Sequence, residues 1–157
     1  MQQKVYLTVN GIRVDDDTNS PILLLSSDDD NRVMPIWIGS IEAVNIAYAK
    51  ENVHTPRPLT HELITNIVDS LNAKVHELTI DDLVDDTFHA HLIINTMQGN
   101  ISIPCRPSDG VSIAIRSGAL ISIDKDLYDA VSIEILEDDY IEQFNAFIKQ
   151  VKPSDFI

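Results

Sequence analysis

Two short segments of the chain place an arginine, a proline and a polar residue where a helix is expected to begin. They are residues 57–62 (Arg-Pro-Leu-Thr-His-Glu) and residues 106–109 (Arg-Pro-Ser-Asp). The start of a helix has unpaired N–H groups and the positive end of the helix dipole, and an arginine adds a planar fork of donors. This pattern indicates an anion site. It is also typical of ordinary helix starts, with Thr60 and Ser108 as caps and the arginines paired to carboxylates for structure.

His61 is the histidine best placed for proton transfer, because it follows the predicted cap Thr60. An imidazole changes charge near neutral pH, so it can serve as a general base or as a phosphate contact. A histidine at the edge of an apolar helix face can also be a packing residue. His89 and His91 share one face of a predicted strand, but no third ligand at a zinc-binding spacing accompanies them.

Glu42 and Asp109 fall at corresponding helix starts in two similar halves of the chain. If a pseudo-twofold axis relates the halves, their carboxylates can converge and either bind one divalent ion or flank an arginine. The acidic runs at residues 15–17, 28–30 and 137–139 fit no EF-hand and are predicted to be solvated turns. Cys105 is predicted to be a small buried hydrophobe rather than a nucleophile.

The composition limits the class of protein. The 157 residues are 44% hydrophobic, with 25 acidic side chains against 11 Lys and Arg, for a formal charge of −14. No apolar run reaches the ~20 residues of a membrane span, and the single cysteine favours a reducing, cytoplasmic compartment. An acidic surface repels polyanions. Nucleic-acid binding would therefore need a local exception to the overall charge.

The chain contains an internal repeat. Residues 4–5 match 74–75 and residues 14–16 match 84–86 at an offset of 70, and residues 42–47 match 109–114 at an offset of 67. An acidic insert at residues 26–31 would account for the change of offset. These matches predict a duplication that relates residues 4–51 to residues 74–118.

Each half of the repeat predicts three strands followed by a helix. The strands are expected at residues 4–14, 21–27 and 32–38, and at 74–84, 87–95 and 100–105. The helices are expected at 40–51 and 107–117, with Pro107 in the first helical position and Gly118 at the stop.

The predicted helices differ in their faces. Helix 40–51 is apolar nearly all round, which favours burial between layers or at a subunit contact. Helix 107–117 has an apolar face of Val111, Ala114, Ile115 and Gly118, and Asp109, Ser112 and Arg116 share the opposite face. Between the halves, an amphipathic helix is predicted to begin after Thr60, with its apolar stripe made by Leu63, Ile64, Ile67, Val68 and Leu71.

The whole pattern predicts an α+β fold. One or more mixed sheets come from the duplicated β-β-β-α unit, with the intervening helix and C-terminal helices added. Residues 1–133 are expected to form the domain, and residues 134–157 a helical tail packed on it or extending from it.

Several of these segments together resemble the bifunctional nuclease domain family. They are residues 34–39 (Met-Pro-Ile-Trp-Ile-Gly), 42–43 (Glu-Ala), 56–63 (Pro-Arg-Pro-Leu-Thr-His-Glu-Leu), 87–90 (Thr-Phe-His-Ala) and 106–109. The resemblance covers roughly residues 4–131. It implies an α+β fold, homo-oligomers, and cleavage of both RNA and DNA.

The resemblance also implies roles for particular residues. His61, Glu62 and Asp109 would be catalytic, and the substrate would be bound by Arg57, Thr60, Arg106, Ser108 and Arg116. Glu42 and Asp109 would hold a divalent metal such as Mg²⁺ or Mn²⁺, although no motif requires one. The chain departs from the family pattern at Pro104, where an acidic residue is usual, and at Gly110, where alanine is usual.

Two functions remain open from the sequence. One is a nuclease in which Arg57 and Arg106 hold the phosphate while His61 and the carboxylates assist. The other is a non-catalytic, homo-oligomeric regulatory or scaffold domain with a small-anion site. The sequence alone does not decide between them.

Overall fold

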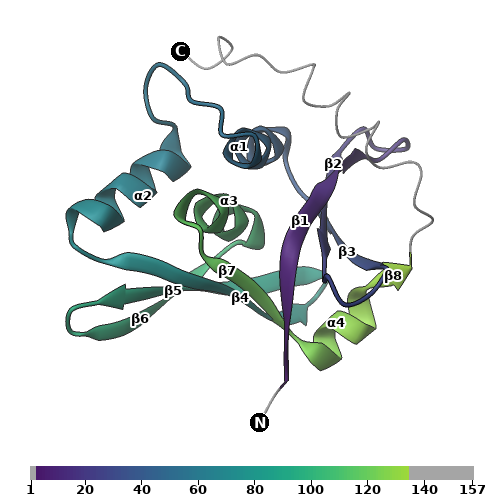
Figure 1. Ribbon diagram of the computed structural model, residues 1–157. Coiled ribbons are helices and arrows are strands. Elements are labelled where there is room, and N and C mark those ends of the chain that lie inside the picture. The colour runs from purple at the N-terminus through teal and green to yellow at the C-terminus, as the bar shows by residue number, and fades with distance from the viewer. Residues whose placement is uncertain (1–2, 135–157) are drawn as a thin grey trace.

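One mixed sheet of eight strands is the frame of the protein in the computed structural model, which describes residues 3–134 (Figure 1). The strands follow the spatial order β6-β5-β4-β7-β1-β2-β3-β8, and only β4 and β7 pair in parallel. Their bounds are β1 (Lys4–Val14), β2 (Pro21–Ser26), β3 (Arg32–Trp37), β4 (Lys74–Val84), β5 (Thr87–Thr96), β6 (Gly99–Cys105), β7 (Leu120–Asp124) and β8 (Ile133–Glu134).

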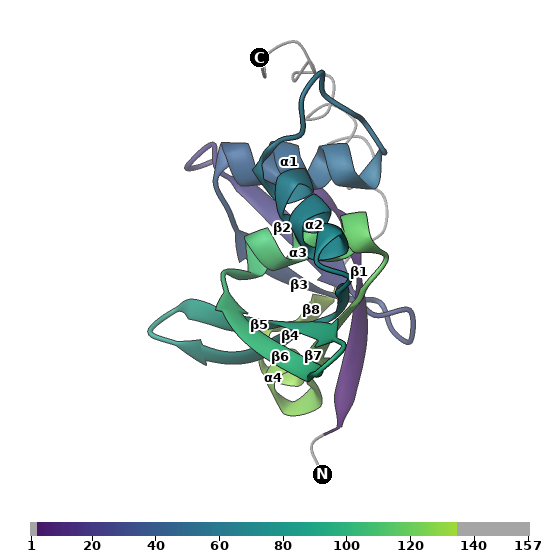
Figure 2. The ribbon, with the colours of Figure 1, turned by 90° about the vertical axis from the view of Figure 1, so that its left-hand side faces the viewer.

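Four helices accompany the sheet in the described residues. They are α1 (Ser40–Lys50), α2 (Thr60–Ser70), α3 (Pro107–Ser117) and α4 (Lys125–Val131). Helices α1, α2 and α3 lie together on one side of the sheet, and α4 lies on the other side (Figures 1 and 2). No helix in this part of the chain is long and apolar enough to cross a membrane.

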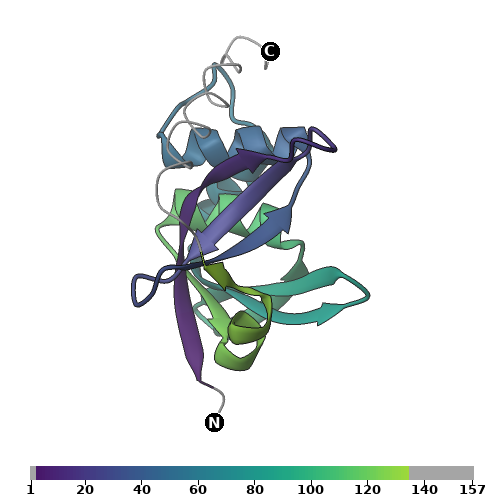
Figure 3. The same cartoon turned by 90° about the vertical axis from the view of Figure 1, so that its right-hand side faces the viewer.

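The predicted α+β fold is confirmed, including the repeated element order. Strands β1-β2-β3 lead into α1, and β4-β5-β6 lead into α3. The two antiparallel meanders flank β7, and the first of them faces the viewer in Figure 3. Both hairpin connections are longer in the first meander, at residues 15–20 and 27–31, than in the second, at residues 85–86 and 97–98. The common origin of the halves stays a prediction.

Strand β7 joins the two meanders, and a buried polar contact holds it there. The Glu77 carboxylate accepts hydrogen bonds from Ser122 Oγ of β7 and, at 2.9 Å, from Lys4 Nζ of β1. Burial alone would raise the pKa of Glu77, but these two donors outweigh it and lower the pKa. The carboxylate is therefore ionised and ties three neighbouring strands together.

Helix α3 is buried on more sides than the sequence suggested. Val111 and Ala114 are buried as expected, but Ser112, expected on the opposite face, is only 1% exposed. The reason is that α3 packs against the sheet and is also covered by α1 and α2 (Figure 1). A Cβ at Gly110 would lie 2.3 Å from Leu78 Cδ1, so this close approach of α3 to β4 needs glycine.

The helix ends confirm some predictions and correct others. Pro107 occupies the first turn of α3, and Gly118 ends it in the left-handed conformation with φ of 66°. Thr60 and Ser108 are not caps. The N-cap of α2 is Leu59 and that of α3 is Arg106, and neither makes a side-chain capping bond. Thr60 and Ser108 instead lie inside the first turns of their helices.

Helix α2 buries only part of its predicted apolar stripe. Val68 is buried and Ile64 packs against the core, but Leu63, Ile67 and Leu71 are 49%, 50% and 72% exposed. The difference arises because α2 lies at the margin of the helix layer, beside α3 (Figure 2). Helix α1, by contrast, is buried from Ala43 to Tyr48, as its apolar sequence predicted for a helix between layers.

Residues 120–134 form three elements that the sequence did not predict: β7, α4 and β8. Helix α4 is attached through Tyr128, which is fully buried and donates a hydrogen bond to Arg32 O at 3.1 Å. The Arg32 guanidinium lies 4.8 Å from the centre of the Tyr128 ring and also pairs with Asp129. The predicted C-terminal tail falls outside the described residues, apart from Glu134, which ends β8.

Candidate functional site

The first turns of three helices meet on one side of the molecule and bring four charged side chains together. Glu42 comes from α1, His61 from α2, and Asp109 from α3, which Arg106 immediately precedes. These residues are far apart in sequence. They meet because α1 packs against α3 and the intervening helix α2 packs beside α3.

The four side chains form a continuous chain of contacts. His61 Nε2 lies 2.8 Å from Asp109 Oδ1. Arg106 donates from Nε to Asp109 Oδ2 at 2.9 Å and from Nη2 to Asp109 Oδ1 at 3.2 Å. Arg106 Nη1 lies 3.1 Å from Glu42 Oε1. Arg106 is therefore held between two carboxylates while its side chain stays 65% exposed.

The contacts fix the charge of Asp109 and the proton arrangement of His61. Partial burial would raise the pKa of Asp109, but the hydrogen bonds from Arg106 and His61 outweigh it and lower the pKa. An ionised Asp109 can only accept hydrogen bonds, so His61 Nε2 carries the proton toward it. In a neutral imidazole, Nδ1 is then the acceptor. This Nδ1 is buried and has no hydrogen-bond partner among the described residues.

A cavity of about 640 Å³ opens beside this cluster. Its mouth carries Glu42, His61, Arg106 and Asp109, with Thr60 next to them. The rest of its lining is mainly apolar and is supplied by α1, α2, α3, β5 and β6, through Ile41, Ile64, Val68, Leu92, Ile94, Ile103, Pro104, Cys105 and Ile113, with the amide of Asn45 as a further polar group. The cluster therefore adjoins a largely apolar space that is large enough for a small molecule.

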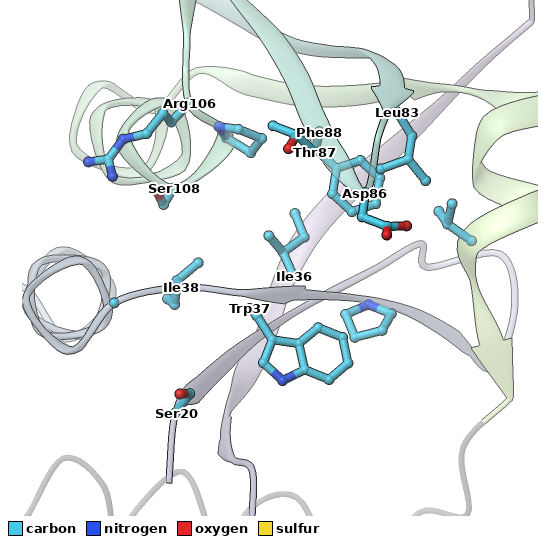
Figure 4. A pocket seen from close by; sticks show the side chains of 14 residues that line it. Ser20, Ile36, Trp37, Ile38, Leu83, Asp86, Thr87, Phe88, Arg106 and Ser108 are labelled. Atoms are coloured by element: carbon cyan, nitrogen blue, oxygen red, sulfur yellow. The ribbon is translucent and has the colours of Figure 1, made fainter. Parts of the chain in front are cut away.

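Arg106 also borders a second hollow of about 740 Å³ between the two meanders. Figure 4 shows this hollow, with Phe88 and Thr87 on one side and Ile36 and Ile38 on the other. The Arg106 head group is turned away from Phe88 in this view. Ser108 lines this hollow together with Arg106 but does not line the cavity at His61, so the structure separates it from Thr60 and His61.

Glu62 and Arg116 lie in a different pocket from His61. Arg116 is nine-tenths buried and donates from Nη2 to Asn45 O at 3.2 Å, while its Nη1 is 3.9 Å from Glu62 Oε2. Glu62 Oε1 is also 3.6 Å from His54 Nδ1. All of these except Asn45 line a pocket of about 510 Å³ between α1, α2 and the end of α3. His61 and Glu62 thus adjoin in sequence but serve two separate clusters.

Arg57 is exposed in the loop before α2 and makes no side-chain hydrogen bond or ion pair within residues 3–134. It does not line the cavity at His61, whereas Arg106 does. The sequence expected these two arginines to close on one phosphate, and only Arg106 is placed at the cavity. Substrate contact by Arg57 stays a prediction.

The carboxylates of Glu42 and Asp109 do converge, but they flank Arg106. Both hold its guanidinium, and no group of three His, Cys, Asp or Glu in the described chain is arranged to bind a metal. In this arrangement the pair does not fit a divalent ion, because the arginine occupies the position between the two carboxylates.

Two further wall residues bear on the chemistry. Burial, with Asp109 and Asp81 nearby, raises the pKa of Cys105 to about 11, which keeps its thiol protonated, as expected of a buried hydrophobe rather than a nucleophile. Pro104 lines the cavity on edge strand β6, so the departure from the family's acidic residue falls in the site itself. His91, which the sequence places on the same strand face as His89, pairs with Asp81 and does not line the cavity.

Sequence reasoning missed the apolar wall. Ile64 was predicted only as part of the apolar stripe of its helix, and Ile103 was not singled out, although both line the cavity. The usable signal was the alternation of β5 and β6, where Leu92 pairs with Ile103 and Ile94 with Ile101 on one face. Only the position of α2 decides which of these side chains remain uncovered.

The fold and the site define a class: an α+β protein with a histidine, an arginine and carboxylates gathered at the mouth of an apolar cavity. The family model of the bifunctional nuclease domain matches residues 23–136. The chain belongs to this family.

Relatives of two kinds accompany the family match. An uncharacterized protein of Mycobacterium tuberculosis (strain H37Rv) is 38% identical over 159 residues, covering 94% of this chain and 95% of that protein. Bifunctional nuclease 1 of Arabidopsis thaliana is 26% identical over 74% of this chain and 37% of its own length. Bifunctional nuclease 2 of Oryza sativa subsp. japonica is 23% identical over 78% of this chain and 39% of its own length. The chain thus spans less than two fifths of these plant proteins.

Proposed function

We propose that this protein is a nuclease that hydrolyses phosphodiester bonds of RNA and DNA at the cavity beside His61. The meeting of His61, Asp109 and Arg106 at the cavity mouth carries the proposal. Membership of the bifunctional nuclease domain family supports it, as do the printed names of the plant relatives.

Arg106 is the group that would hold the phosphate. A guanidinium has five N–H donors, and the contacts with Asp109 and Glu42 engage Nε and one hydrogen on each terminal nitrogen. The two remaining N–H groups belong to a side chain that is mostly exposed. The contacts with Asp109 and Glu42 fix the orientation of the guanidinium, so that it can stabilise the charge that develops on the phosphate oxygens.

His61 is the group that would move the proton. With Nε2–H directed to Asp109, Nδ1 is the ring nitrogen that has a free lone pair. It is buried in this arrangement, so a small movement of the cluster on substrate binding would give it access to the water molecule whose proton it accepts. The water oxygen forms a bond to phosphorus, and the P–O bond to the leaving sugar oxygen breaks. That oxygen takes up a proton from solvent water, and the imidazolium later releases its proton to solvent. Asp109 keeps the ring in the required tautomer and stabilises the imidazolium that forms.

The acidic surface sets a limit on this function. With a formal charge of −14, the protein as a whole repels a polyanion. Attraction at the cavity comes from Arg106, which is flanked by the carboxylates of Glu42 and Asp109, so affinity for nucleic acid is expected to come from a few local contacts. The proposed function does not require a long row of Lys and Arg side chains of the kind that binds duplexes non-specifically.

The proposal is tested by assaying cleavage of single-stranded RNA and DNA with Mg²⁺, Mn²⁺ or EDTA, using wild type, Arg106→Ala and Arg13→Ala. Loss of the phosphate contact in Arg106→Ala should reduce kcat/KM roughly 100-fold. Arg13→Ala is the matched control, because it removes an arginine of β1 that does not line the cavity. Cleavage that is the same in Arg106→Ala as in wild type would identify a contaminant and contradict the proposal.

A second candidate is a homo-oligomeric regulatory or scaffold domain, and the exposed face of α2 favours it. Leu63, Ile67 and Leu71 recur every four residues, so they form one apolar stripe on the helix surface. Half or more of each side chain is exposed. Such a stripe is typical of a helix face that a second copy covers.

The oligomer is tested by light scattering at micromolar concentration. Leu63→Glu/Ile67→Glu places two charges on the stripe and should convert an oligomer to monomers, because two carboxylates would have to be buried in the contact. Met97→Glu, at a fully exposed turn outside α2, is the control and should leave the mass unchanged. A monomeric wild type would rule out the scaffold.

A further inference from the structure

The cavity behind the charged cluster is larger and more apolar than phosphate binding requires. Its volume of about 640 Å³ lies within the range of small-molecule sites, ~300–1,000 Å³. Leu92 and Ile94 of β5 line it, and Ile64 of α2 and Ile113 of α3 add further apolar side chains. A phosphate bound at Arg106 alone would leave this surface in contact with water.

The charged lining residues come from the starts of the helices, whereas β5 and β6 contribute only uncharged side chains. A ligand that matches this division has an anionic group joined to a body with apolar surfaces. A nucleotide has this form, because the apolar faces of its base extend several ångströms from its phosphate.

The mouth is also suited to an unpaired strand. Ile103 on edge strand β6 and Ile41 at the start of α1 both line the cavity and are substantially exposed. A base can enter such a space only after it has left its stack and lost its pairing partner. This is easiest in a single strand.

We infer that this cavity receives one base of a single-stranded substrate while the adjoining phosphate lies at Arg106. The inference rests on the proposed nuclease function, which it deepens by assigning the base a binding pocket. It also gives the side chains of β6 a role in substrate binding, through Ile103.

The test is a binding measurement in EDTA, so that it does not depend on cleavage. The probes are a deoxynucleoside 5′-monophosphate, inorganic phosphate, and an 8-nucleotide single strand. Ile103→Trp fills the cavity from an exposed edge position. Ile101→Trp is the matched control, because Ile101 lies two residues away on the same face of β6 but does not line the cavity.

Ile103→Trp should weaken binding of the nucleotide and of the single strand by about tenfold or more, the scale of one lost base contact. It should leave the affinity for inorganic phosphate unchanged, and Ile101→Trp should change none of the three. A second measurement uses wild type alone: a strand with every base removed should bind about tenfold more weakly than the intact strand.

Three outcomes would overturn the inference. They are equal effects of the two tryptophan variants, wild type binding the nucleotide no more tightly than phosphate, and decanoate binding more tightly than the nucleotide, which would assign the cavity to an acyl chain. None of these depends on whether Arg106→Ala abolishes cleavage. Nucleotide binding that is sensitive to Ile103→Trp, in a protein without cleavage activity, would support the base pocket and contradict the nuclease.

Discussion

Replacing His61 with alanine should reduce kcat for phosphodiester cleavage by roughly 100- to 10,000-fold, the usual contribution of a general base. The reason is that Nε2 is committed to Asp109 at 2.8 Å, which leaves the buried Nδ1 as the ring nitrogen that can take the proton once a movement of the cluster admits water to it. Because the phosphate contact at Arg106 is retained, KM should change much less than kcat. The measurement is steady-state cleavage of a fluorescent single-stranded oligonucleotide.

His54→Ala is the control for this experiment. His54 is exposed and lies near Glu62 in the neighbouring pocket, away from the cavity at His61. Its loss should alter kcat by no more than about twofold. If both histidine variants lose activity equally, or if His61→Ala keeps wild-type kcat, His61 is not the base. Circular dichroism of both variants checks that the fold is retained.

Replacing Tyr128 with alanine should lower the free energy of unfolding by about 3–5 kcal/mol, the usual cost of removing a buried aromatic ring. Tyr128 is fully buried and is the residue through which α4 is attached to the rest of the fold. Its ring also packs against the Arg32 guanidinium. Urea denaturation followed by circular dichroism gives the value directly.

Tyr128→Phe separates the ring from the hydroxyl. It keeps the packing and removes the hydrogen bond to Arg32 O, so the free energy of unfolding should fall by only about 1 kcal/mol. A similar loss in both variants would show that the hydroxyl, and not ring burial, attaches α4. Neither substitution touches the cavity at His61, so the folded variants should keep the wild-type affinity for nucleotide.

Much of the fold could be predicted because local pattern and repetition agree. Alternating residues gave the six strands of the two meanders, and Pro107 with Gly118 gave the exact limits of α3. The short elements after Gly118 were missed because a five-residue strand and a seven-residue helix carry too little periodicity to identify. The apolar stripe of α2 could be predicted, but its exposure could not, because periodicity reports an apolar face without saying what covers it.

The site could be predicted only in part. Arg106 and Asp109 are three residues apart, so their pairing follows from helix geometry. The contact of His61 with Asp109 spans 48 positions, and only the motifs pointed to it. Nothing local separates Glu62 from His61, yet helix geometry turns adjacent side chains in different directions and sends them into different pockets. The cavity wall depends on where α2 lies over the sheet, which no single segment encodes.

The central place of β7 has a consequence for how the protein is made. The first residues of β1, Lys4 to Leu7, pair with β7 at Asp124 to Ile121, whereas their own hairpin partner β2 begins to pair only at Thr8. During translation this stretch has no strand to join until residue 124 has left the ribosome. Closure of the sheet is therefore a late step, and a pairing across about 120 positions makes it a slow one.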